Sequence, residues 1–81
     1  MKKSEFMKEF YKTLDDMEEY YKSLDENDEV KVEVEVHFED GFFVADDISF
    51  VPLNKEIVFL KLRGRTVGMI SLSKIKRVEG I

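Results

Sequence analysis

The side chains best suited to bind an anion lie in the last third of the chain. From residue 57 to residue 81, six cations face Glu79 alone, a net charge of +5. Arginine guanidinium groups match phosphate oxygens in pairs, and lysine adds point charge. Two explanations stay open: a phosphate-contacting patch, or cations that balance acidic residues within the chain or across a subunit interface. The candidate residues for nucleic acid or a partner are Arg63, Arg65, Lys74, Lys76 and Arg77.

The rest of the chain is acidic. Residues 1–29 carry five lysines against ten carboxylates, and residues 30–56 carry two lysines against seven, so each part has a net charge of −5. Such segregation predicts a polarised surface. The overall charge of −5 argues against indiscriminate nucleic-acid binding, although a local site is compatible with it.

Three carboxylates and the only histidine repeat every second residue at Glu33, Glu35, His37 and Glu39. Same-face neighbours on one strand lie roughly 6.5–7 Å apart. That spacing is too wide to share one metal ion unless other strands supply ligands. We therefore predict a solvated strand face and no metal site.

No set of residues predicts catalysis. Asp46 and Asp47 would point to opposite faces of a strand, so they would not converge on one substrate. One histidine and no cysteine leave no catalytic triad beyond a chance arrangement, and the four glycines are too scattered to form a phosphate loop. The prediction is a protein that is not an enzyme and binds no cofactor.

Residues 4–25 have the periodicity of an amphipathic helix. Apolar residues recur at gaps of three and four, and residues 25–28 (Asp-Glu-Asn-Asp) should end the helix. The stripe could dock on the rest of the domain, or it could pair with another helix or a partner. This predicted interaction face consists of Met7, Phe10, Leu14, Met17, Tyr21 and Leu24.

Residues 30–79 change to a period of two. The clearest strand is 30–38, where valines alternate with charged residues, and Asp40-Gly41 should form the hairpin turn after it. A bulge at Asp46-Asp47 should bend the next strand. The predicted strands are 30–38, 42–51, 57–62, 66–72 and 76–79. One helix and five sequential strands indicate an α+β fold in which the helix packs on a strongly bent, antiparallel small barrel of SH3-like or Sm-like type.

Length and composition predict one domain over residues 1–81. Without cysteine there is no disulfide. No apolar stretch approaches the ~20 residues of a membrane span, so we expect a cytoplasmic protein without a membrane partner.

The order of elements resembles the Sm-like family, and the strand lengths resemble its Hfq-like branch. Residues 37–41 (His-Phe-Glu-Asp-Gly) are similar to the end of the Sm1 motif, Asn54 could stand at its RNA-loop asparagine, and Arg63-Gly64 resembles the Arg-Gly of Sm2. In the family, however, that Arg-Gly follows the fourth strand, and residues 72–74 lack the aromatic residue and histidine of Hfq-like proteins. The resemblance implies a ring in which the fourth strand of one subunit pairs with the fifth strand of the next. It also implies RNA contacts by Lys74 and Asn54.

The predicted function is a small, non-catalytic interaction or assembly module, homo-oligomeric, with an acidic helix and a basic C-terminal edge. An Sm/Hfq-like RNA-binding ring is the alternative. A second alternative is a regulatory or anti-defence protein whose acidic helix mimics nucleic acid and blocks a basic partner.

Overall fold

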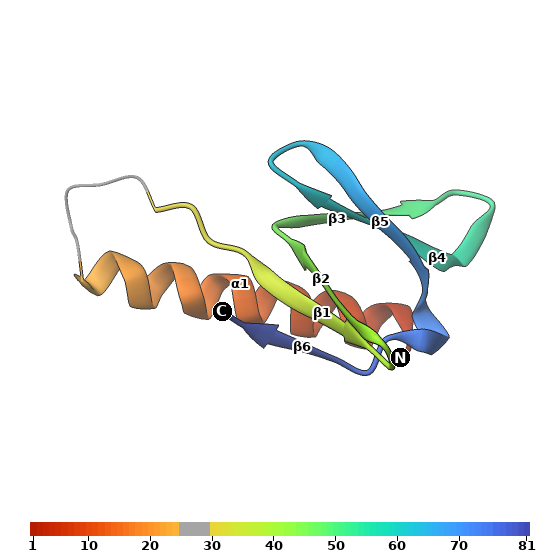
Figure 1. Cartoon of the computed structure of the whole chain (residues 1–81), viewed down its shortest axis with the longest axis horizontal. Coiled ribbons are helices and arrows are strands. Elements are labelled where there is room, and N and C mark those ends of the chain that lie inside the picture. The colour runs from red at the N-terminus through yellow and green to blue at the C-terminus, as the bar shows by residue number, and fades with distance from the viewer. Residues whose placement is uncertain (25–29) are drawn as a thin grey trace.

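The computed structural model describes residues 1–24 and 30–81, which form one long helix, six strands and a 3-10 turn (Figure 1). In chain order these are α1 (Lys3–Leu24), β1 (Val34–Phe38), β2 (Gly41–Ala45), β3 (Asp47–Val51), β4 (Asn54–Leu62), β5 (Arg65–Ser71), η1 (Leu72–Lys74) and β6 (Arg77–Gly80). The predicted helix is confirmed to its last described turn. Its predicted end at residues 25–28 lies outside the described residues.

The first sheet has the order β2-β1-β6, with both neighbours antiparallel to β1. The alternation predicted for β1 is confirmed, because Val34 and Val36 are fully buried. The predicted turn is displaced by one residue. Phe38 pairs with Gly41, so Glu39 and Asp40 form the turn and the glycine begins β2.

Left-handed backbone occurs instead in the turn between β4 and β5. Arg63 has φ 51° and Gly64 has φ 82°. Two successive positive φ angles are what a tight two-residue hairpin needs, and glycine adopts them without a Cβ penalty.

The long second strand breaks where the sequence predicts a bend. Asp46 separates β2 from β3, and its backbone N–H donates to the Lys61 carbonyl oxygen at 2.8 Å. Ala45 at the end of β2 and Ile48 in β3 are both buried in the core, although three positions rather than two separate them. One extra residue thus keeps both halves facing inward while the chain passes from the first sheet into the second.

The second sheet has the order β3-β4-β5, again antiparallel. Among the described residues no ladder joins β5 to β6, so backbone pairing does not close the sheets into a barrel. The α+β class is therefore confirmed, whereas a closed five-stranded barrel stays a prediction.

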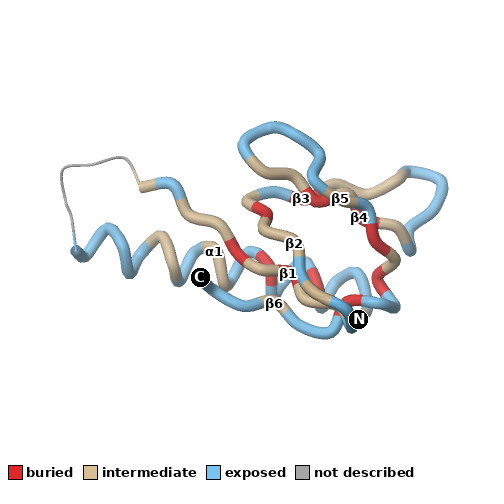
Figure 2. The backbone as a smooth tube through the Cα atoms, viewed as in Figure 1, coloured by how far each residue is buried: buried red, intermediate tan, exposed pale blue. Residues whose placement is uncertain are grey.

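The core lies between the two sheets and α1 (Figure 2). The ring of Phe43, on β2, reaches across to β5 and lies over Gly68, where an added Cβ would come within 2.7 Å of that ring. The side chain of Met17 lies equally close over Gly80, on β6. Gly68 therefore allows the first sheet to approach β5 closely, and Gly80 allows the helix to approach β6 closely.

The helix docks over the stretch from Phe6 to Met17. Phe6 and Phe10 are fully buried, and Leu14 and Met17 pack against the same core. Three members of the predicted interaction face are not buried within the chain, since Met7, Tyr21 and Leu24 are 36%, 39% and 65% exposed. The last two belong to the C-terminal half of α1, which extends beyond the end of the sheets (Figure 1). Pairing of this face with another helix or a partner stays a prediction. Phe6 occupies the place in the core that the sequence assigns to Met7.

In the part of the chain that the structure describes, no helix is long and apolar enough to cross a membrane.

Candidate functional site

Two of the five predicted cations are engaged within the chain. The Arg63 guanidinium contacts Asp46 at 2.6 Å and Glu33 at 3.1 Å, and the Asp46 carboxylate also accepts the backbone N–H of Arg63. These contacts fasten the β4–β5 turn to the bend in the second strand. Arg77 pairs with Glu79 on the same strand. Charge balance within the chain therefore accounts for both arginines.

Arg65, Lys74 and Lys76 make no ion pair with any described residue. Lys74 ends η1, and Lys76 precedes β6, where its backbone N–H donates to the His37 carbonyl oxygen at 2.8 Å. This backbone contact holds the connection to β6 against the end of β1. The two lysine side chains are thus positioned by a short, well-fastened segment.

Both lysines line a groove of about 660 Å³ at the end of the two sheets. The lining mixes apolar and polar side chains, and Glu39 and Asp40 contribute carboxylates from the β1–β2 turn. The apolar lining residues include Phe38, Phe43, Ile57 and Met69. Apolar side chains beside charges of both signs are suited to a peptide segment or to a base with its phosphate.

Asn54 is not among the residues that line this groove. It begins β4, and its side-chain oxygen accepts the backbone N–H of Glu56 at 3.1 Å. The asparagine thus supports a local turn. The RNA contacts by Asn54 and Lys74 that the resemblance implies stay a prediction.

Among the described residues, each sheet has two edge strands, β2 and β6 in the first sheet and β3 and β5 in the second. Because β2 continues through Asp46 into β3, the two sheets are joined at that side, and β5 and β6 form the opposite edges. On β5, Val67 and Met69 are 40% and 61% exposed. Such an edge offers unpaired N–H and C=O groups together with apolar side chains, which makes it a template for another strand.

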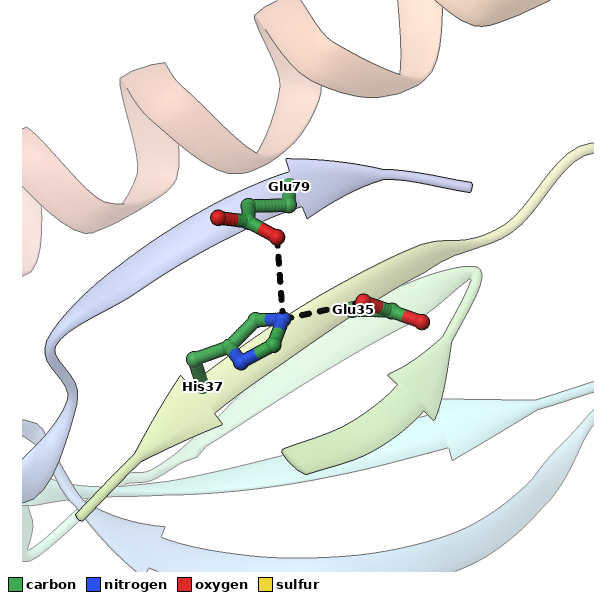
Figure 3. Close-up of side chains that lie close together, drawn as sticks. All are labelled: Glu35, His37 and Glu79. Carbon is green, nitrogen blue, oxygen red and sulfur yellow. Dashed lines mark hydrogen bonds and ion pairs between the residues drawn. The ribbon is translucent and has the colours of Figure 1, made fainter. Parts of the chain in front are cut away.

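A third cluster lies on the outer face of the first sheet and includes a residue that the sequence analysis did not connect to it. The Nε2 atom of His37 lies 2.9 Å from a carboxylate oxygen of Glu35 and 3.3 Å from one of Glu79 (Figure 3). Glu79 comes from β6, directly opposite Glu35 in the ladder. The Arg77 guanidinium lowers the pKa of Glu79, outweighing the opposing effect of burial. The sequence offered one signal, namely that Glu79 is the only acidic residue of the basic third.

Comparison of the chain with protein-family models, curated proteins and solved structures found no match.

Proposed function

We propose that this chain is a small, non-catalytic assembly module whose copies join edge to edge, β5 of one subunit beside β6 of the next. The observation that carries the proposal is the strand order, which places β5 and β6 at the sheet edges opposite the β2–β3 junction. Adding a strand to each edge would satisfy its backbone groups.

The exposed side chains of β5 support the same contact. Val67 and Met69 would pack against cross-strand neighbours on the incoming strand. A contact between two different edges is heterologous, so each added subunit again presents a free edge. The assembly then either closes into a ring or grows into a filament. A closed dimer is inconsistent with this contact.

Charge supports association between copies as well. Lys74 and Lys76 lie at the groove, while the exposed surface of α1 carries Asp15, Asp16 and Glu19. Complementary surfaces on one chain favour contacts between copies at low ionic strength.

The test is the solution mass, by size-exclusion chromatography with light scattering. We expect a ring of at least three 9.6-kDa chains or a filament. Replacing Val67 and Met69 by lysine places two charges on β5, and this variant should elute as a monomer. The matched control replaces Tyr20 and Leu24 by lysine, which adds the same charge at exposed positions of α1 and should leave the mass unchanged. A wild-type monomer or dimer, or a β5 variant with the wild-type mass, would overturn the proposal.

An RNA-binding ring is the second candidate, favoured by two lysines beside Phe38 and Phe43 in one groove. Phosphates could contact the lysines while bases stack on the rings. A fluorescent single-stranded RNA should then co-elute with the oligomer at low salt and be released steeply as salt rises. Replacing Lys74 and Lys76 by glutamate should abolish co-elution. Absence of RNA binding at low salt rejects this candidate and leaves the assembly proposal intact.

A further inference from the structure

The geometry points to a zinc site on the outer face of the first sheet, formed by the Nε2 atom of His37 and one carboxylate oxygen each from Glu35 and Glu79. This site does not depend on the assembly of copies.

The three ligand atoms already converge. They lie within 4.8 Å of one another, and the nitrogen is 2.9 Å and 3.3 Å from the two oxygens. Zinc bonds of about 2.0–2.1 Å in a tetrahedron place neighbouring ligand atoms roughly 3.3–3.4 Å apart. Of the two nitrogen–oxygen separations, that to Glu79 has this value, and that to Glu35 reaches it by a shift of a few tenths of an ångström in the Glu35 side chain. The two carboxylate oxygens lie within 4.8 Å of each other, so rotation of the glutamate side chains would complete the geometry.

The backbone fixes this convergence. Glu35 and Glu79 are cross-strand partners on β1 and β6, and His37 follows Glu35 by two residues on the same face. The spacing of residues along one strand therefore does not exclude a metal site, because β6 supplies the third ligand. The His37 ring is also supported by the ring of Phe42, whose centroid lies 5.1 Å away.

Among the described residues, Arg77 is the only arginine or lysine that pairs with either glutamate, and it contacts Glu79 alone. Two glutamates directly opposite each other in a ladder repel. The Nε2 atom of His37 faces both carboxylates, and a single ring nitrogen can donate at most one N–H to the two of them (Figure 3). One divalent ion would neutralise the repulsion and bind all three atoms at once.

The donor set selects the class of metal. One imidazole with two carboxylates suits zinc and neighbouring transition metals, whereas magnesium and calcium prefer six or more oxygen ligands. Three protein ligands leave a fourth position for water.

Arg77 limits the affinity of the site. Its guanidinium holds the other oxygen of Glu79, and one of its nitrogens lies 3.5 Å from Nδ1 of His37. When Nε2 binds a metal, Nδ1 must carry the proton, so two donors then face each other. Arg77→Gln removes both this conflict and a positive charge, and it should tighten zinc binding.

Nuclear magnetic resonance tests the site directly, because His37 is the only histidine and its ring signals are unambiguous. Zinc should shift these signals saturably at one ion per chain, while excess magnesium should not. Isothermal titration calorimetry should show affinity reduced at least about tenfold in Glu79→Gln and Glu35→Gln, and increased in Arg77→Gln. The matched control is Glu39→Gln, an exposed carboxylate of the adjacent turn, which should bind zinc as the wild type does.

Two results would overturn the site. In the first, the His37 signals stay unchanged at a several-fold excess of zinc over protein, which would leave the cluster as a hydrogen-bonded group only. In the second, Glu79→Gln binds zinc as tightly as the wild type while its circular dichroism spectrum shows the native fold. The magnetic resonance spectrum of the wild type with zinc tests the site even if a variant fails to fold.

Discussion

Tyr11 lies on the first half of α1, where its phenol approaches the Asp47 carboxylate at the start of β3. Burial, followed by the charge of Asp47 and a hydrogen bond to it, raises the pKa of Tyr11 above its usual 10.0. The folded protein therefore keeps a proton that the unfolded chain loses as the pH rises through 10. By linkage, this group stabilises the fold at lower pH, and the contribution declines as the pH rises above 10.

We expect the unfolding free energy of the wild type, measured by urea denaturation, to fall between pH 9.5 and pH 11 by more than that of Tyr11→Phe. The control is Tyr20→Phe on the exposed part of the same helix, which should follow the wild-type profile. Equal alkaline losses in the wild type and Tyr11→Phe would show that Asp47 does not influence this phenol.

At the level of strands, Gly68 allows the two sheets to approach. A Cβ at Gly68 would meet three atoms of the Phe43 ring at 2.7–2.9 Å, and that ring is itself held beside Phe38 at a centroid distance of 5.3 Å. Gly68→Ala should therefore force the sheets apart and cost about 1–3 kcal/mol in urea unfolding.

Gly41→Ala provides the matched control for this substitution. The nearest atom to its added Cβ is 3.6 Å away, an ordinary contact, and Gly41 has no positive φ. Because alanine also restricts the unfolded chain, this variant should be neutral or slightly stabilising. Equal losses in the two variants would contradict the packing argument.

The sequence predicts elements well where a periodic pattern extends over many residues. The alternation around Val34 and Val36, and the bend beside Asp46, follow from local patterns, and both are present. The inward position of Phe6 could not be predicted, because the apolar stripe of α1 is wider than the surface that the sheets offer. Likewise, the meeting of Glu79 with His37 depends on the pairing of β6 with β1, which joins residues about forty positions apart.

Over the whole molecule, ion pairs neutralise part of the charge that is segregated along the sequence. Arg63 is held by Asp46 and Glu33 of other segments, and Arg77 by Glu79 on its own strand, so two of the six cations of the basic third are paired within the chain. Of the other four, Lys74 and Lys76 line the groove. The basic surface is therefore smaller than the charge of the segment indicates.

Helix and sheets share one core, so they should unfold together. Phe10 is fully buried against both, and Phe10→Ala should cost about 3–5 kcal/mol, a large part of the stability of so small a domain. All three tyrosines lie on α1 and the chain has no tryptophan, so tyrosine fluorescence reports on the helix. The near-ultraviolet signals of Phe42, Phe43, Phe50 and Phe59 are too weak to report the unfolding of the strands. Amide infrared absorption follows that unfolding better.

In urea, the fluorescence and infrared transitions of the wild type should coincide, and Phe10→Ala should shift both to lower urea by the same amount. The control is Leu24→Ala, at a position 65% exposed beyond the sheets, where the change should stay within about 0.5 kcal/mol. If fluorescence moved in Phe10→Ala while the infrared transition stayed in place, α1 would be an appendage that unfolds separately. The strands would then have to form a stable core without Phe6 and Phe10. The complete burial of both rings against Val34, Val36 and Leu72 argues for the cooperative outcome, because removing the helix would expose the apolar residues of both sheets at once.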